Sequence, residues 1–136
     1  MSRKKRGYDW EDKVTKIFEK NGWKAVRLGS PSVHLPDVLA VNDKRNTIVA
    51  VEAKAASGDK IYVPKDEIER LFRFLSIFGA YKHKAALIAV KFLKKKGKNM
   101  KESFYEVASV PERGLTFYRN RDEFPKEVAP WSFEPS

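Results

Sequence analysis

The sequence contains three carboxylates and one lysine whose types and spacing suit metal-assisted hydrolysis. Glu11 stands near the N-terminus, Asp37 follows a proline, and Glu52 and Lys54 are two positions apart. Carboxylate oxygens are the hard ligands that Mg²⁺ and Mn²⁺ prefer. Such a cation lowers the pKa of a bound water and stabilises the charge that develops on a phosphoryl oxygen. The chemistry that this set predicts is hydrolysis of a phosphate ester.

Each member of the set has an expected role. Asp37 and Glu52 would hold the cation, with the backbone carbonyl of Ala53 as a further ligand. Glu11 would complete the ligand shell, directly or through water, because Mg²⁺ keeps several of its waters. Lys54 would orient the attacking water, help to deprotonate it, or stabilise the pentacovalent anion, and the sequence does not choose among these roles.

A surface ion pair between Glu52 and a lysine is the alternative, since this spacing occurs often by chance. Two features count against it: the pair ends an otherwise apolar strand, and Asp37 is expected beside it. Like charges are costly at such short range unless they share a cation or a proton.

Two predicted strands bring the set together. Residues 47–54, TIVAVEAK, are apolar on both faces until the end, as expected of a strand that is covered on both sides. Residues 37–41 predict a second strand, and the polar residues 42–46 predict a hairpin turn between them. Asp37 and the Glu52–Lys54 end are nearly equidistant from that turn, so antiparallel pairing makes them neighbours.

Residues 8–21 predict an amphipathic helix that carries Glu11 at the edge of its apolar face. That face consists of Trp10, Val14, Ile17 and Phe18. A strand over residues 23–28 follows, and it contains Arg27.

A second helix is predicted from Pro64 to about Phe78, with two apolar stripes. The stripe that can cover the sheet consists of Ile68, Leu71, Phe72 and Leu75. The other consists of Phe74, Ile77 and Tyr81, with Phe78 between the two stripes. This second stripe needs a cover, for which we expect a second subunit; the alternative is the chain's own C-terminal segment.

Other short apolar runs complete an α/β pattern. Strands are expected over residues 61–63, 85–93, 104–109 and 115–118. The lysine-rich loop over residues 94–101 is either a solvated hairpin or a phosphate contact. Four prolines after residue 110 leave the C-terminal region without a predicted regular structure. No repeat or long linker is present, so we expect a single domain over residues 1–136.

The formal net charge is +10, from 28 basic and 18 acidic residues, which favours a polyanionic partner. The basic arm Arg3, Lys4, Lys5 and Arg6 is either a solvated terminus or a phosphate contact, and its position before Glu11 favours phosphate contact. No cysteine, no signal-peptide core and no run of 18 apolar residues is present, so we expect a cytoplasmic protein without a membrane span.

The order E…PD…ExK after a leading helix resembles the PD-(D/E)xK nuclease superfamily and, within it, the archaeal-type Holliday junction resolvases of the Hjc family. The resemblance covers roughly residues 4–92. It includes PD at Pro36–Asp37, VEAK at Val51–Lys54, the RLxxFxxxFG run at Arg70–Gly79 and AVKF at Ala89–Phe92. The last two motifs are more specific to the family than the catalytic set.

The resemblance implies an α/β, restriction-endonuclease-like fold with a central mixed β-sheet flanked by helices. It implies a homodimer that binds four-way DNA junctions by their structure and makes paired symmetric nicks with Mg²⁺, for which Mn²⁺ would substitute. It assigns the four residues of the opening set to catalysis and metal binding. It matches Arg27 with a functional basic residue, Ser30 with a serine of the loop near the site, and Phe74 and Phe78 with interface aromatics, beside which Ile77 is expected.

The chain departs from the family at Asp12, where many members have Arg, and at Glu67, where some have Gln. Both changes remove a neutral or positive group near phosphate, but neither touches the metal set. Another superfamily nuclease of the repair or restriction type is an alternative, although the small size leaves little chain for sequence readout. A non-catalytic DNA-binding module and a basic scaffold that merely dimerises are alternatives of other classes.

Overall fold

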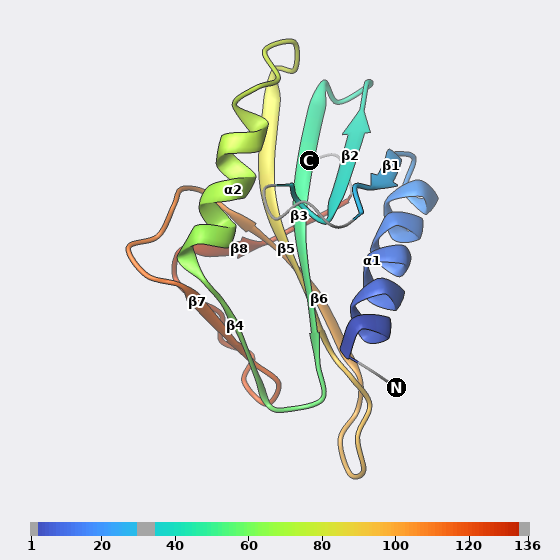
Figure 1. Ribbon diagram of the computed structural model, residues 1–136, viewed down its shortest axis with the longest axis vertical. Helices are drawn as coiled ribbons and strands as arrows, with labels where there is room; N and C mark the ends of the chain where they lie inside the picture. The colour runs from blue at the N-terminus through green and yellow to red at the C-terminus, as the bar shows by residue number, and fades with distance from the viewer. Residues whose placement is uncertain (1–2, 30–34, 134–136) are drawn as a thin grey trace.

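The computed structural model describes residues 3–29 and 35–133, with side chains from residue 7 onward (Figure 1). Two helices are present in this part of the chain, α1 (Arg3–Lys20) and α2 (Lys65–Leu75). The strands are β1 (Lys24–Arg27), β2 (Val38–Asn42), β3 (Thr47–Ala56), β4 (Lys60–Val63), β5 (His83–Phe92), β6 (Lys101–Val107), β7 (Leu115–Tyr118) and β8 (Val128–Pro130). Neither described helix is long and apolar enough to cross a membrane.

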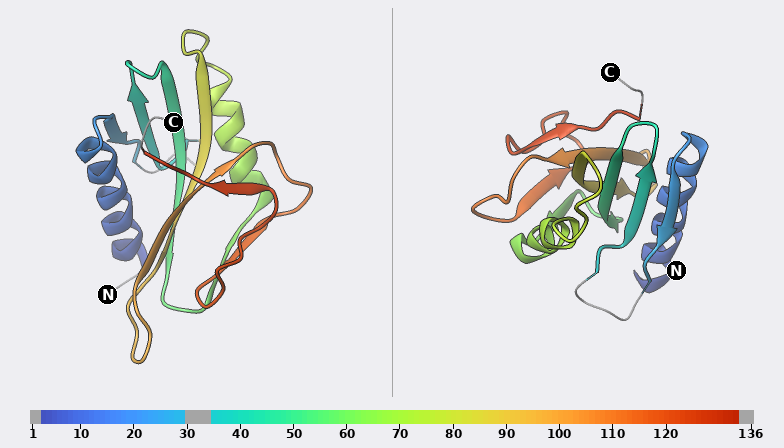
Figure 2. Two further views of the ribbon diagram at one scale, coloured as in Figure 1. Left: turned by 180° about the vertical axis from the view of Figure 1, so that it is seen from behind. Right: turned by 90° about the horizontal axis from the view of Figure 1, so that it is seen from above.

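Six strands form one mixed sheet in the order β1-β2-β3-β5-β6-β8. β3 and β5 pair in parallel, whereas the other neighbours pair antiparallel. β4 and β7 form a separate antiparallel ribbon. α1 and α2 lie on opposite faces of the large sheet (Figure 2). The predicted central mixed sheet flanked by helices is therefore confirmed.

β3 lies in the middle of the sheet and is buried over its first six residues. Val49 and Val51 belong to the core under α1, whereas Ile48 and Ala50 belong to the core under α2. This alternation confirms the predicted faces of the strand. Because both faces of β3 are buried, the polar groups at its end lie close to an apolar interior.

α1 is anchored by Trp10, which is buried and donates a hydrogen bond from Nε1 to the carbonyl of Ala89, at 2.9 Å. The helix begins at Arg3, five residues before the predicted start at Tyr8. The prediction was wrong because it followed the apolar periodicity, which starts only at Trp10. Lys and Arg are good helix formers, so the basic residues extend the helix without contributing to its apolar face.

α2 ends at Leu75 rather than near Phe78, which corrects the predicted length. The Ser76 hydroxyl donates to the carbonyl of Arg73 at 2.6 Å, and such a local bond competes with the helical pattern. The following amides of Ile77 and Phe78 bond three residues back, in the tighter turn that often ends a helix. The apolar residues after Leu75 therefore lie on a turn, not on a helix.

The C-terminal segment was predicted to lack regular structure, yet it contributes the edge strand β8. Pro130 is tolerated there because an edge strand has one side free of ladder hydrogen bonds. Beyond it, Trp131 and Phe133 pack on the core under α1, where the ring centroids of Phe133 and Phe18 are 4.9 Å apart. The described part of this segment thus covers the α1 face and does not cover the second stripe of α2.

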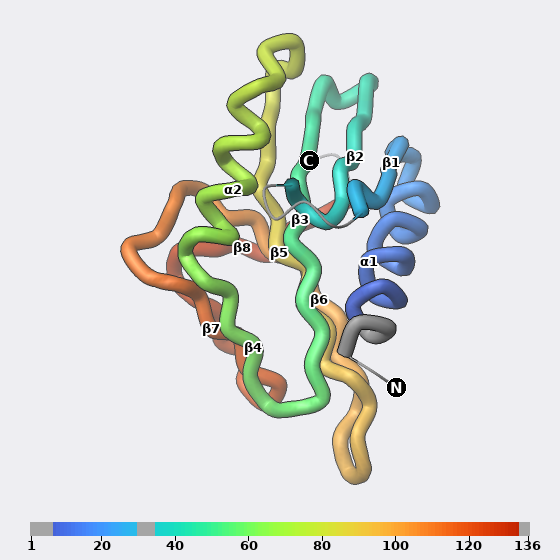
Figure 3. Tube along the Cα trace, in the orientation of Figure 1, coloured from blue at the N-terminus to red at the C-terminus, as the bar shows by residue number. Residues whose placement is uncertain are grey.

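Arg119 connects the loop between β3 and β4 to the hairpin between β5 and β6, two segments that both extend toward the lower end of the trace in Figure 3. Its side chain is only 6% exposed and lies 3.3 Å from the carboxylate of Asp59. The guanidinium donates to four backbone carbonyls at 2.9–3.2 Å, those of Ser57, Gly58, Leu93 and Asn99. The loop between β3 and β4 is therefore fixed to the hairpin between β5 and β6.

Replacing Arg119 with Ala should lower the free energy of unfolding by about 3–5 kcal/mol, because five hydrogen bonds from a buried guanidinium to backbone carbonyls and its ion pair with Asp59 are lost together. Urea unfolding followed by circular dichroism measures this change. The exposed Arg113, replaced in the same way, should change stability by less than about 0.5 kcal/mol. Equal effects of the two substitutions would contradict the structural role of Arg119.

Candidate active site

The register of β2 and β3 places Asp37 beside Glu52. Val38 pairs with Val51, and the Asp37 amide donates to the Val51 carbonyl at 3.0 Å. The Ala53 amide donates to Asp37 Oδ2 at 2.8 Å, which orients the carboxylate. The charge of Asp37 acts on Glu52, so the two carboxyl groups are close enough to interact. The predicted juxtaposition of the two carboxylates is thus present in the structure.

Glu52 is the most buried member of the site, with 8% of its surface exposed. Burial, reinforced by the negative charge of Asp37, raises the pKa of Glu52 to about 9. Burial also raises the pKa of Asp37, although the Ala53 amide and Lys54 oppose the shift. Two carboxyl groups in this position either share a proton or need a cation.

Lys54 projects from β3 between two carboxylates. Its Nζ lies 3.7 Å from Glu52 Oε2 and 2.5 Å from Glu67 Oε1. Burial lowers the pKa of Lys54, but the hydrogen bond to Glu67 and the charges of Glu52 and Asp37 outweigh it, so the pKa is raised. The Lys54 side chain is therefore a protonated ammonium group, positioned by Glu52 and Glu67, rather than a neutral amine that could act as a base.

Glu67 is a site residue whose role was not predicted from the sequence. It lies in the first turn of α2, and its Oε2 is 3.8 Å from Arg70 Nη2. The sequence marked it only as a departure from the family pattern. Its contact with Lys54 depends on how α2 packs over β3, which no local motif encodes.

Glu11 and Arg27 form a second part of the site on the α1 side. Glu11 Oε1 lies 4.0 Å from Arg27 Nε, and the guanidinium of Arg27 lies over the Tyr8 ring, 4.3 Å from its centroid. Burial, together with the charge of Asp37, raises the pKa of Glu11 to about 7, while Arg27 opposes the shift. The negative charge of Asp37 therefore contributes to the raised pKa of Glu11.

The donor set fits a hard divalent cation. Glu52 is buried and Asp37 is half-buried, and burial is the main cause of the raised pKa of each carboxyl group, so a bound cation would offset the cost of ionising them. Among the described residues, no three acidic or histidine side chains converge as a ready-made metal cluster. The pair is accordingly the core of the candidate site, and a direct or water-mediated role for Glu11 stays a prediction.

The remaining predicted residues have different outcomes. Ser30 lies outside the described residues. The backbone of Arg3, Lys4, Lys5 and Arg6 is helical, but their side chains lie outside the described part. The Ala53 amide serves Asp37, and the use of its carbonyl as a ligand stays a prediction.

The predicted interface residues lie at the end of α2. The rings of Phe74 and Phe78 are 5.2 Å apart and are half-buried against the core under α2. Ile77 is 73% exposed. The structure thus leaves one large apolar side chain of the second stripe open to solvent.

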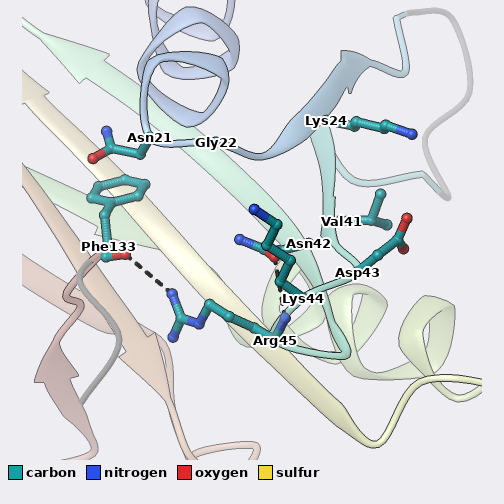
Figure 4. A pocket seen from close by; sticks show the side chains of 9 residues that line it. All are labelled: Asn21, Gly22, Lys24, Val41, Asn42, Asp43, Lys44, Arg45 and Phe133. Carbon is teal, nitrogen blue, oxygen red and sulfur yellow. Dashed lines mark hydrogen bonds between the residues drawn. The ribbon is translucent and has the colours of Figure 1, made fainter.

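A hollow of about 410 Å³ lies at the turn end of the β2–β3 hairpin, and neither Asp37 nor Glu52 lines it. Figure 4 shows the side chains that line the hollow. Arg45 crosses it and donates from Nη1 to the Phe133 carbonyl at 3.2 Å. Its guanidinium also lies 5.1 Å from the ring centroid of Trp23. This hollow is bordered by the attached C-terminal segment and holds none of the predicted catalytic residues.

The mixed sheet, its two covering helices and the carboxylate–lysine cluster define a protein of the restriction-endonuclease-like class. Residues 2–123 match the family described as "Archaeal holliday junction resolvase (hjc)", and the chain belongs to this family.

Individual relatives agree with this assignment. The chain is 41% identical over 82 residues to a "Crossover junction endodeoxyribonuclease" of Sulfolobus islandicus rod-shaped virus 1, covering 58% of this chain and 66% of the relative. It is 34% identical over 90 residues to "Crossover junction endodeoxyribonuclease Hje" of Saccharolobus islandicus strain REY15A, covering 63% of each. The matched segment thus spans just under two thirds of these relatives.

A solved structure shares the fold. It is "1.6A resolution structure of Archaeoglobus fulgidus Hjc, a Holliday junction resolvase from an archaeal hyperthermophile". The TM-score is 0.62 with 24% sequence identity, over 82% of this chain and 88% of that one. The expected restriction-endonuclease-like fold is confirmed by this match.

Proposed function

We propose that this protein is a structure-selective endonuclease that resolves four-way DNA junctions by Mg²⁺-dependent hydrolysis. The observation that carries the proposal is the position of Asp37 beside the buried Glu52, with Lys54 Nζ 3.7 Å from Glu52 Oε2. The family of the chain and the names of its relatives support the junction as substrate. The net charge of +10 supports binding to a nucleic acid.

The chain's own residues have distinct tasks in this proposal. Asp37 and Glu52 would hold Mg²⁺. When bound, this ion would lower the pKa of a water molecule and neutralise negative charge on the phosphate. The Ala53 amide keeps the Asp37 carboxylate oriented. Lys54 donates hydrogen bonds to the developing phosphoryl anion, because its raised pKa favours the ammonium form over a base. Arg27, whose Nε lies 4.0 Å from Glu11 Oε1, would bind an adjacent phosphate.

A substrate comparison tests this function. The folded protein is incubated in Mg²⁺ with a labelled four-way junction and with a linear duplex of matching sequence. We expect the junction to be cut and the duplex to remain intact. Equal cutting of both would indicate a general nuclease, and an intact junction would contradict the proposal.

We also propose that the protein acts as a homodimer joined through the end of α2. Ile77 is exposed there beside the half-buried rings of Phe74 and Phe78, and the described C-terminal residues pack elsewhere. Two active sites in one assembly would explain paired symmetric nicks. We further propose that residues 1–136 work as one nuclease domain in the cytoplasm, with the basic arm on phosphates.

Replacing Ile77 with Glu should weaken the dimer about tenfold or more, because a charge would be buried in the interface. Ile77 is a cleaner choice than Phe74, whose ring also packs in its own subunit's core. Sedimentation equilibrium measures the dissociation constant. Val110, another exposed apolar residue, replaced with Glu, serves as the control. An unchanged Ile77→Glu dimer would locate the interface elsewhere.

A further inference from the structure

A hollow of about 400 Å³ opens beside Lys54, between the end of β3 and β4. The two strands diverge there because each pairs with other partners: β3 with β2 and β5, and β4 with β7 (Figure 1). Its wall also includes Ser57, Lys60 and Tyr62. None of the described residues that line it is acidic. The hollow is therefore a polar, positively charged space that shares one wall with the candidate active site.

Tyr62 is one of the residues that line this space, and it is the only aromatic residue among the described ones there. β4 alternates, so that Ile61 and Val63 are buried whereas Lys60 and Tyr62 point outward. Tyr62 is 58% exposed, which is unusual for so large a ring.

Gly114 fixes the position of this ring. A Cβ atom built on Gly114 would clash with the Oη, Cζ and Cε1 atoms of Tyr62, so the ring lies directly on the glycine backbone. The strand register agrees, since Tyr62 pairs with Thr116 two residues away. One side of the ring is thus supported by the chain, while much of the remaining surface faces solvent.

The rest of the wall is pre-formed. Arg119 holds the Ser57 and Gly58 carbonyls, so the loop at the base of the hollow is fixed before any ligand arrives. The Asp59 carboxylate is neutralised by Lys98 at 2.6 Å and by Arg119 at 3.3 Å. Lys60 accordingly contributes positive charge to the hollow, whereas Lys54 on its wall is paired with Glu52 and Glu67.

We propose that this hollow binds the nucleotide next to the cleaved phosphate, with Tyr62 stacking on its base and Lys60 near its backbone. This inference rests on the proposed DNA cleavage at Lys54. An exposed ring above a positive groove suits a strand with flat bases and regular phosphates. In a continuous duplex each base already stacks on both sides, so Tyr62 can stack only where a base is unstacked. Tyr62 would therefore favour branch points over linear duplex.

Fluorescence of 2-aminopurine, placed at the branch nucleotides of a four-way junction, tests the proposal without cleavage when measured in EDTA. We expect wild-type protein and Tyr62→Phe to change the fluorescence alike, and Tyr62→Ala to lose that change. Tyr62→Ala should bind the junction about five- to 150-fold more weakly, as stacking on one base predicts. Tyr62→Leu, which still covers Gly114 but cannot stack, should behave like Tyr62→Ala.

Replacing Phe124, an exposed aromatic residue outside the hollow, with Ala should leave both readouts unchanged. Wild-type affinity and fluorescence of Tyr62→Ala or Tyr62→Leu would overturn the proposal, and so would an equal loss in Tyr62→Phe. Cleavage of the junction in Mg²⁺ is followed in parallel. If the junction is cleaved but the Tyr62 substitutions change neither affinity nor fluorescence, only the stacking role is refuted. If neither the wild type nor any variant cleaves the junction, the proposed function is refuted.

Discussion

Junction cleavage should fall at least about 10³-fold when Glu52 is replaced with Gln, whereas junction binding should stay close to that of the wild type. Glutamine has almost the same shape but no negative charge, so the buried pair with Asp37 loses its capacity to hold a cation. Lys54→Ala should cause a loss of similar size, because the positive charge next to the phosphoryl group is removed. Single-turnover cleavage and fluorescence anisotropy separate the two effects.

The control for this prediction is Glu112→Gln, which removes an exposed carboxylate outside the site. It should cut the junction at the wild-type rate. Cleavage by Glu52→Gln at more than about a tenth of that rate would mean that the pair does not carry catalysis. Retention of both binding and cleavage in the two site variants would favour a nuclease centre elsewhere.

Without metal, stability should fall as the pH rises from about 5 to 9, and Glu52 should account for much of the fall. The pKa of Glu52 moves from 4.5 to about 9 on folding, so between these values the folded state keeps a proton that the unfolded state has lost. Because the folded state binds more protons than the unfolded state in this range, the free energy of unfolding decreases as the pH rises, by up to about 1.4 kcal/mol per pH unit for one group. Glu11 acts in the same direction up to about pH 7.

Urea unfolding in EDTA at several pH values measures this slope. Glu52→Gln should flatten it and should be more stable than the wild type at pH 8, whereas Glu112→Gln should follow the wild type. Added Mg²⁺ should stabilise the wild type more at pH 8 than at pH 5.5, because ligands must be deprotonated to bind. If the free energy of unfolding depends on pH in the same way for the wild type and Glu52→Gln, the raised pKa of Glu52 is contradicted.

The hairpin of β2 and β3 shows how much of the site was predictable. The predicted turn over residues 42–46 is polar, and Asp37 and Glu52 are nearly equidistant from it, so the register followed from the sequence. In the structure Asn42 still pairs with Thr47, and the turn is residues 43–46. The same alternation predicted which side chains of β3 face each helix. These features are local, or involve one short turn, and are therefore encoded in adjacent residues.

Other parts of the site depend on packing between distant segments. Glu67 contacts Lys54 only because α2 lies over β3, and its position in the helix does not reveal this. Tyr62 lies on Gly114, 52 positions later in the chain, because β4 pairs with β7. The three-residue strand β8 has too few residues for any periodicity, and its formation depends on β6 as a template.

The most direct test of the proposed function is the dependence of four-way-junction cleavage on Mg²⁺. Strand cleavage is measured with a fixed amount of wild-type protein, first in EDTA and then over a series of Mg²⁺ concentrations, with a linear duplex alongside. We predict no cleavage in EDTA, saturable cleavage of the junction in Mg²⁺, and an intact duplex. Junction cleavage that persists at full rate in EDTA, or that never appears in Mg²⁺, would contradict the assignment of the Asp37–Glu52 pair as a metal-dependent nuclease centre.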